Sequence, residues 1–430
     1  MLEQVFKLSA NGTSVRTELV AGLTTFLTMA YIIFVNPAIL ADAKMPFGAV
    51  FTATCVAAAI GCFLMAFLAN YPIALAPGMG LNAYFAYGVV GGMGYSWQVA
   101  LGCVFFSGIL FLIISVLPLR EWIVNAIPKS LKMAIAAGIG LFLALIALKN
   151  AGIVVANPAT LVTHGKLVSW PVLMAVLGFA LIVGLEYRRV MGGVIIGILV
   201  VTVISILAGQ QKFAGIIDMP PSIAPVFFQM DLAGAMKVGL VTVVFAFLFV
   251  DLFDNTGTLI GLAHRGGFMR PDGTVPRLRG VLISDSAAAA IGAAVGTSTT
   301  TSYIESASGI NAGGRTGLTA AAVGVLFLLA LFVAPLAGSI PAYATAPALL
   351  YVACLMARGL TEVEWNDLTE AAPAVITALA MPFTFSIADG IAFGFISYAG
   401  IKIAAGRFRD VHPAVGILAV LFVIKYVVIR

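Results

Sequence analysis

The amino-acid sequence predicts an all-α, polytopic membrane protein with about 14 transmembrane segments. Of its 430 residues, 61% are hydrophobic and 10% are charged, whereas soluble proteins use roughly 45–50% apolar and about 25% charged residues. Two long stretches, Met45–Leu119 and Thr316–Ala357, contain no Asp, Glu, Lys, Arg or His. A helix that crosses the hydrocarbon needs about 20 apolar residues, so the first stretch alone accommodates about three crossings. This composition excludes a soluble globular fold and a disordered chain.

The apolar stretches fall into two series of predicted spans. The first series lies near residues 20–40, 49–69, 74–90, 97–118, 131–148, 171–187 and 191–208. The second lies near residues 235–256, 279–296, 298–313, 317–334, 345–358, 371–387 and 389–405. A last apolar stretch, Val411–Ile429, is either a fifteenth crossing or an interfacial helix.

The two series resemble each other. The segment GLTTFLTMAYIIFVN from Gly22 matches GLVTVVFAFLFVDLFDN from Gly239, and the close-packing pair GVIIG near the end of the first series matches GIAFG in the second. Chance similarity between apolar segments is the alternative to a duplication. A duplicated half with an odd number of spans would enter the membrane inverted, and inverted repeats are typical of transporters.

Basic residues in the predicted loops indicate the orientation. The net charge of +5 would suggest nucleic acid as a partner of a soluble protein, but here the excess lies between spans. We therefore predict no nucleic-acid partner and a multi-pass cell-membrane protein with a cytoplasmic N-terminus. The basic residues that support this orientation are Arg120, Lys129, Lys132, Arg188, Arg189, His264, Arg265, Arg270, Arg277, Arg279, Arg407 and Arg409.

Two segments are too interrupted to be plain membrane helices. In YPIALAPGMGLNAYF, Tyr71–Phe85, an apolar run is interrupted by Pro77, Gly78 and Gly80. In GTSTTTSYIESASG, Gly296–Gly309, the β-branched residues Thr297–Thr301 favour an extended strand. Irregular backbone survives at membrane depth only when it is buried in protein or lines a cavity. Interrupted segments at the third place of both series predict the position of a transporter's binding site.

Carboxylates inside the predicted spans mark an ion or substrate path, because they are costly there. They are Asp251, Asp254, Asp285 and Glu305. Each has a structural alternative: Glu305 completes a capping box with Ser302, and the first two could cap the end of the eighth span. Asp285 could belong to a network with Asp254 or share a proton with it. Asn82 could satisfy broken backbone or offer its amide to a ligand.

The sequence lacks the motifs of other function classes. It has no phosphate-binding G-x-x-x-x-G-K-[ST] motif and no zinc-ligand spacing in the spans, so we predict no ATP-driven transport, no metal site and no cofactor. An intramembrane aspartyl protease would place its acids on facing helices, whereas Asp251 and Asp254 share one helix face. A carboxylate kept out of water takes up a proton readily, which suits Asp254 or Asp285 in proton coupling, although sodium coupling stays open.

Acids without a basic partner favour cations or neutral molecules rich in N–H groups. A carboxylate can accept two adjacent N–H groups, which flat heterocycles offer. We predict that Thr301 and Ser302, which end the extended segment before Glu305, also line the site. Four phenylalanines of the eighth span are a candidate stacking wall, although at least half of them are expected to face lipid: Phe245, Phe247, Phe249 and Phe253.

Four stretches carry a family resemblance: GTSVRTELVAGLTTFLTMAYIIFVNP, APGMGLNAYF, DLFDNTGTL and TSTTTSYIESASGINAGGRTGL. They resemble the AzgA-like purine permeases, the adenine or guanine/hypoxanthine branch of the xanthine/uracil permease superfamily. Glu305 is followed by Ser306, Ala307 and Ser308, which departs from the [QEP]-N-x-G motif of the xanthine/uric-acid branch. This departure argues against xanthine as the main substrate.

The resemblance implies two inverted seven-span repeats, about 15–210 and 233–410. Spans 1–4 and 8–11 would form a core domain and spans 5–7 and 12–14 a gate domain, with short strands in spans 3 and 10. It implies that Asp251 and Glu305 hydrogen-bond a purine, supported by Asn82, Asp254 and Asp285. It also implies proton-coupled import, homodimers and elevator-like motion of the core. The alternative within transport is an anion exchanger or channel of the same fold, for which Arg315 is the available basic residue.

Overall fold

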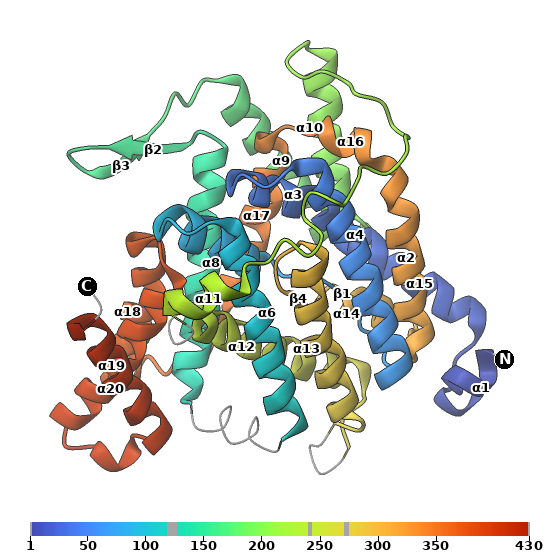
Figure 1. Cartoon of the computed structure of the whole chain (residues 1–430). Helices are drawn as coiled ribbons and strands as arrows, with labels where there is room; N and C mark the ends of the chain where they lie inside the picture. Colours follow the sequence, from blue (N-terminus) through green and yellow to red (C-terminus); the bar gives the residue numbers. More distant parts are fainter. Residues whose placement is uncertain (1, 118–126, 240–242, 271–274, 429–430) are drawn as a thin grey trace.

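The computed structural model describes residues 2–117, 127–239, 243–270 and 275–428, without the side chains at 238, 239, 253, 254, 256, 260, 425 and 428. Within these residues, ten helical segments are long and apolar enough to cross a membrane. Two shorter apolar helices, Gly193–Leu207 and Leu368–Thr384, and the two interrupted segments bring the number to fourteen, as predicted. The elements are shown in Figure 1.

Each series contains seven membrane segments in the same order. The first series comprises α2 (Val15–Met29) with α3 (Ile32–Asp42), α4 (Phe47–Leu64), β1 (Leu75–Pro77) with α5 (Met79–Ala83), α6 (Trp97–Val116), α8 (Lys129–Asn150), α9 (Trp170–Tyr187) and α10 (Gly193–Leu207). The second comprises α12 (Phe245–Gly266), α13 (Leu278–Val295), β4 (Thr300–Ser302) with α14 (Ser306–Asn311), α15 (Gly317–Ala330), α17 (Ala342–Ala357), α18 (Leu368–Thr384) and α19 (Ile387–Ala404). Outside the series lie α1 (Leu2–Phe6), the hairpin β2 (Val154–Asn157) and β3 (Leu161–His164), α11 (Leu232–Gly239), α16 (Ala334–Gly338) and α20 (Pro413–Val428).

The eighth span lies about ten residues later than predicted. The sequence placed it near 235–256, but α11 ends at Gly239 and α12 runs from Phe245 to Gly266. The polar run after Asp251 therefore does not end the helix, and the interpretation of this acid as a C-terminal cap is wrong. Asn255 is completely buried inside the helix, so protein rather than lipid surrounds this polar stretch.

The helix packing follows an approximate two-fold exchange of the two series. Helix α6 packs on α13, and the exchanged pair α4 and α15 also pack together. The pair α8 and α18 corresponds in the same way to α17 and α9, and α9 with α10 corresponds to α18 with α19. This pattern is what two copies of one unit produce.

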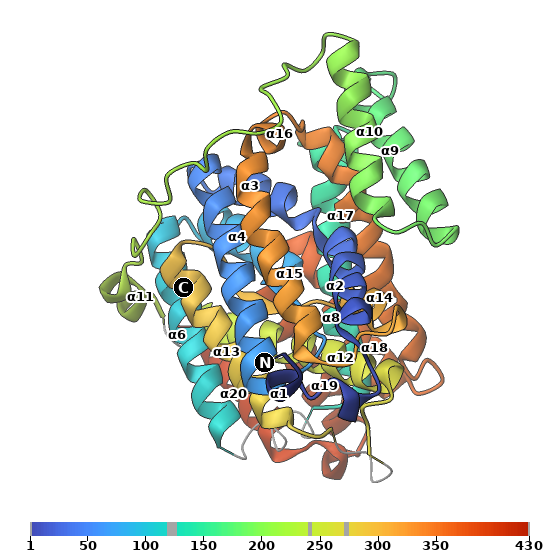
Figure 2. The same cartoon turned by 90° about the vertical axis from the view of Figure 1, so that its right-hand side faces the viewer.

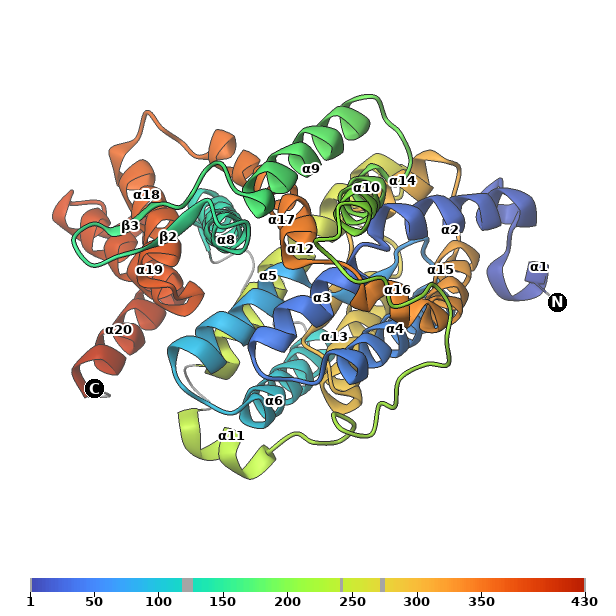
Figure 3. The ribbon, with the colours of Figure 1, turned by 90° about the horizontal axis from the view of Figure 1, so that it is seen from above.

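The same contacts divide the helices into two packed groups. Helices α2, α4, α6, α13 and α15 pack on one another, and α8, α9, α10, α17, α18 and α19 form the second group. Seen from above, α2 and α15 lie at one end of the molecule and α18, α19 and α20 at the other (Figure 3). In the view of Figure 2, α9 and α10 lie side by side at the edge of the second group.

Helix α20 runs back along α19 in the opposite direction. The Tyr426 hydroxyl, near the end of α20, donates to Asp389 near the start of α19 at 2.5 Å. The rings of Phe422 and Phe395 lie 6.1 Å apart further along the pair. With 16 residues, α20 is shorter than the about 20 that a crossing needs, so the choice between a fifteenth crossing and an interfacial helix stays open.

A cluster of charges ties α18 to α19. Lys402 is buried and its Nζ lies 2.8 Å from the Glu370 carboxylate. In the loop before α18, hydrogen bonds from Thr369 and from Arg407 hold the pKa of the Asp367 carboxyl well below its usual range. The second group of helices is therefore fastened at this end by ion pairs rather than by apolar packing alone.

Candidate functional site

The two interrupted segments meet near the middle of the molecule as a pair of antiparallel strands (Figure 1). In the register, Leu75 lies opposite Ser302 and Pro77 opposite Thr300. The backbone N–H of Gly78 donates to the Thr299 carbonyl at 2.9 Å, so pairing continues past the strands. Both strands are completely covered by protein. The predicted strands in spans 3 and 10 therefore exist and satisfy each other's backbone groups, as membrane depth requires.

Asp285 of α13 holds strand β4 in place. One of its carboxylate oxygens accepts the backbone N–H and the hydroxyl of Ser302, both at 2.8 Å, and the Thr301 hydroxyl at 3.4 Å. Asp285 is completely buried. The structure thus brings together three predicted site residues, and Ser302 uses its hydroxyl on this carboxylate.

Glu305 is half-buried at the position just before α14. Its Oε1 accepts a hydrogen bond of 2.6 Å from the hydroxyl of Tyr31, which lies where α2 gives way to α3. The side chain of Glu305 makes no capping bond to α14, and the helix starts too late for Ser302 to be its cap. The capping-box alternative is therefore wrong, and the carboxylate is held by another span.

Asn82 of α5 is completely buried beside the segment that leads into β4. Its Oδ1 accepts a short hydrogen bond from the Ser298 hydroxyl. Its Nδ2 has no hydrogen-bond partner within the described part of the chain. An unpaired amide in a buried position costs roughly 1–3 kcal/mol, so a ligand or water that accepts this N–H group would be favoured.

Helix α12 borders strand β4 and the short helices α5 and α14. Asp251 lies in its second turn and is 1% exposed, and Asn255 follows one turn later on the same face. Neither amide atom of Asn255 has a hydrogen-bond partner among the described residues. The predicted coupling residue Asp254 has a side chain outside the described set, and its role stays a prediction.

Two of the four phenylalanines of α12 are buried in protein. Phe247 and Phe249 are buried, and their rings lie 4.8 Å from Tyr84 and 6.4 Å from Phe395, respectively. Phe245 is half-buried, and Phe253 lies outside the described side chains. The two buried rings remain candidates for a stacking wall, and the expectation that at least half of the four face lipid stays a prediction.

Sequence reasoning missed Tyr31 and Asn255. Tyr31 belongs to an apolar run and its partner Glu305 is 274 residues away, so no local pattern indicates the contact. Asn255 opens the polar run NTGT, and such a run predicts the end of a helix. The available signal was its spacing, because it lies four residues after Asp251.

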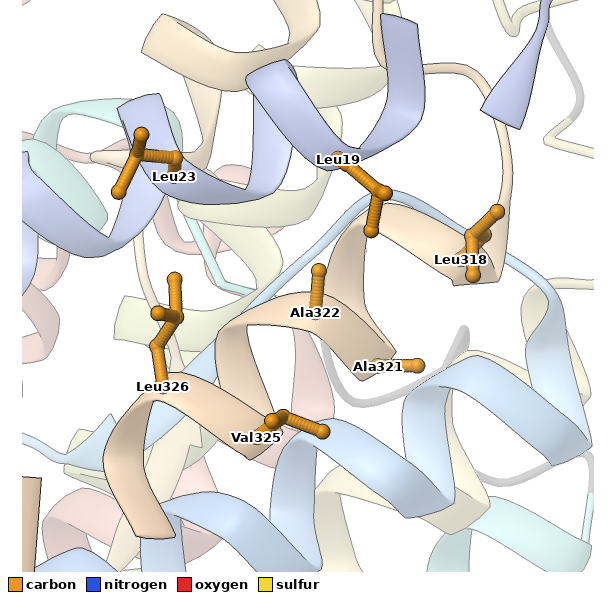
Figure 4. A pocket seen from close by; sticks show the side chains of 7 residues that line it. All are labelled: Leu19, Leu23, Leu318, Ala321, Ala322, Val325 and Leu326. Carbon is orange, nitrogen blue, oxygen red and sulfur yellow. The ribbon is translucent and has the colours of Figure 1, made fainter. Parts of the chain in front are cut away.

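An apolar groove lies away from these residues, between α2 and α15 (Figure 4). It measures about 380 Å³. Its lining side chains are all aliphatic: Leu19, Leu23, Leu318, Ala321, Ala322, Val325 and Leu326. A polar ligand would find no hydrogen-bonding side chain there, so the groove is not the predicted site.

Comparison with known proteins identifies the family. The model of the Permease family, Xan_ur_permease, matches residues 16–393. Adenine permease AdeP of Escherichia coli strain K12 is 50% identical over 429 residues, which is all of this chain and 96% of that protein. Guanine/hypoxanthine permease PbuG of Bacillus subtilis strain 168 is 45% identical over 441 residues, which covers both chains completely.

Solved structures share the fold at low identity. The transmembrane domain of the cyanobacterial bicarbonate transporter BicA matches with a TM-score of 0.63 and 17% identity, over 89% of this chain and 97% of that one. The murine anion transporter Slc26a9 in its inward-facing state gives 0.65 and 12%, over 91% and 68%. These matches assign the two-repeat fold with core and gate domains. The chain therefore belongs to the Permease family of xanthine/uracil-type transporters and is a transporter rather than an enzyme.

Proposed function

We propose that this protein imports purine nucleobases, adenine or guanine and hypoxanthine, by proton symport. The permease relatives named for adenine and for guanine/hypoxanthine support the substrate class. These relatives are named for different purines, so they do not distinguish adenine from guanine and hypoxanthine as the substrate of this protein. The remaining support for the proposal comes from the residues of the site.

The observation that carries the proposal is the half-buried carboxylate of Glu305, held by Tyr31 beside the strand pair. A carboxylate accepts N–H groups and repels anions. Arg315, the basic residue close to this segment in sequence, donates from one guanidinium nitrogen to the carbonyls of Ile310 and Gly314, both at 2.7 Å. Because this cation is used on backbone, the site favours a neutral N–H donor such as a purine over an anion.

We assign Asp251 and Glu305 to direct hydrogen bonds with the purine. Asn82 offers its unpaired Nδ2 to a ring nitrogen or carbonyl of the base. Thr301 and Ser302 form the wall of the site through their contacts with Asp285. These assignments place donors and acceptors from spans 3, 8 and 10 around one ligand.

Asp285 and Asp254 are assigned to proton coupling. The bound oxygen of Asp285 accepts the Ser302 backbone N–H and hydroxyl. A proton on this carboxylate would weaken both bonds, because a neutral carboxyl is the poorer acceptor. Protonation would therefore alter strand β4 at the place where the purine binds. No metal ion or organic cofactor is needed for this cycle.

The protein is proposed to lie in the cell membrane with its N-terminus in the cytoplasm. The loops rich in Lys and Arg then lie on the cytoplasmic side, as the positive-inside rule requires. We further propose that it works as a homodimer in which the core moves relative to the gate.

Uptake of labelled adenine, guanine, hypoxanthine and uracil in a host that lacks its own permeases tests the function, with and without a protonophore. Purine uptake is expected, and it should be lost on adding the protonophore. Glu305→Gln and Asp251→Asn should abolish uptake while the protein stays in the membrane. Normal uptake by both variants would refute the site, and sodium-dependent, protonophore-resistant accumulation would refute proton coupling.

Bicarbonate, sulfate and chloride in excess are the control for the alternative of an anion exchanger. They should leave purine uptake unchanged. Competition by one of them at millimolar concentration would favour the anion alternative.

A further inference from the structure

A further buried acid, Glu18 of α2, binds the start of α15. One oxygen accepts the backbone N–H of Arg315 at 2.8 Å. The other accepts the N–H groups of Thr316 and Thr319, both at 3.2 Å, and the Thr319 hydroxyl at 2.6 Å. Glu18 is completely buried, and three of its four donors are backbone N–H groups at the start of a helix, where intrahelical acceptors are scarce.

The segment fixed in this way is the connection from α14 to α15. Helix α14 has six residues, and an isolated helix of that length is not stable in itself. Its position must therefore come from its contacts. Arg315 reaches back to the carbonyl of Ile310, so the residue whose N–H binds Glu18 also holds the end of α14.

Helix α2 also lies directly against α14. A Cβ atom at Gly309 would overlap the Thr25 hydroxyl and would come within 2.6 Å of the Ala21 carbonyl oxygen. A Cβ atom at Gly314 would lie 3.0 Å from the Ala21 side chain. Glycine thus allows the two backbones to touch, as small residues do between membrane helices.

The first span therefore holds the tenth segment at both ends. Tyr31 binds Glu305 just before α14, and Glu18 binds the connection after it, with the glycine contact between them. We infer that Glu18 is a positioning residue for Glu305. Glu18 acts through α14 and sets where the Glu305 carboxylate meets the substrate. The inference rests on the proposed role of Glu305 in binding the purine.

The test compares KM and Vmax for labelled adenine and hypoxanthine, with Vmax normalised to transporter in the membrane. Glu18→Gln replaces one acceptor oxygen with an NH₂ group that faces N–H donors. Gly309→Ala displaces α14 without changing charge. Each should raise KM about tenfold, the ratio that corresponds to 1.4 kcal/mol of binding free energy.

Two matched controls should keep the wild-type KM. Glu3→Gln removes an exposed acid of the N-terminal segment, and Gly400→Ala adds a methyl group where no other atom lies within 4 Å. If Glu18 has a purely structural role, membranes of cells that express Glu18→Gln will contain less transporter, or the transporter will have a lower thermal stability. Its KM will then be unchanged.

The outcomes separate this inference from the proposed function. Normal uptake by Glu305→Gln would overturn both. Loss of uptake in Glu305→Gln together with wild-type KM in Glu18→Gln and Gly309→Ala would overturn the positioning role alone. If Glu18→Gln does not reach the membrane, Gly309→Ala decides the question in the same assay.

Discussion

Replacing Tyr31 by phenylalanine removes one hydroxyl and keeps the ring that packs at the junction of the first span. Tyr31 is 1% exposed and its hydroxyl lies 2.6 Å from Glu305 Oε1. A hydrogen bond to a charged group contributes about 1.5–3 kcal/mol. Because Glu305 is proposed to bind the purine, loss of the lower value would raise KM about tenfold.

The assay is uptake of labelled hypoxanthine and adenine at several concentrations by cells with matched amounts of transporter. Vmax should change less than KM, since the hydroxyl orients the carboxylate that is proposed to bind the purine. Tyr343→Phe is the matched control, because this half-buried hydroxyl has no hydrogen-bond partner in the described part of the chain. A wild-type KM for Tyr31→Phe, or an equal rise in the control, would refute the reasoning.

Three further predictions concern the gate and its contact with the core. Gly80→Ala should lower Vmax, because the added Cβ atom would lie 2.6 Å from Ile139 Cγ2 of α8. The double variant with Ile139→Ala should regain uptake. Failure of this rescue would exclude a steric cause. Lys402→Met should lower the stability in a detergent melt by about 3 kcal/mol, because it removes the cation from the Glu370 carboxylate and leaves it the Tyr398 hydroxyl as a donor. Adding Glu370→Leu should recover much of this loss. An unchanged melting temperature in the single variant would contradict this reasoning. The lowered pKa of Asp367 stabilises the folded state at pH values above the pKa of the unfolded carboxyl, and this stabilisation is lost as the pH falls through the folded pKa. Asp367→Asn should therefore be less stable than wild type at neutral pH, and its melting temperature should depend less on acid pH. An identical pH profile of melting would disprove this prediction.

The broken segments could be predicted from the sequence because their composition is locally decisive. Proline and glycine interrupt one apolar run, and the run Thr297–Thr301 favours an extended backbone over a helix. Irregular backbone in a membrane must be buried in protein or line a cavity, and the strand pair meets this requirement. The register of Leu75 with Ser302 could not be predicted.

Contacts between distant residues could not be predicted in the same way. The capping-box pattern at Ser302 is local and common, whereas its actual partner Asp285 is 17 residues earlier on another helix. The Tyr31 hydroxyl meets Glu305 only because α2 packs on α14. The start of α12 was misplaced because the residues before it are as apolar as the helix itself.

The antiparallel strand pair has a consequence for how the chain is made. Strand β1 emerges from the ribosome long before β4, because Ser302 lies more than 200 residues after its partner Leu75 in the sequence. At roughly 5–20 residues per second, that delay is on the order of ten seconds or more. During it, the backbone groups of β1 lack their final partners, so hydrocarbon is a costly place for this segment. The first half must therefore stay in a protected, partly hydrated setting, such as the insertion machinery, until the second half arrives to complete it.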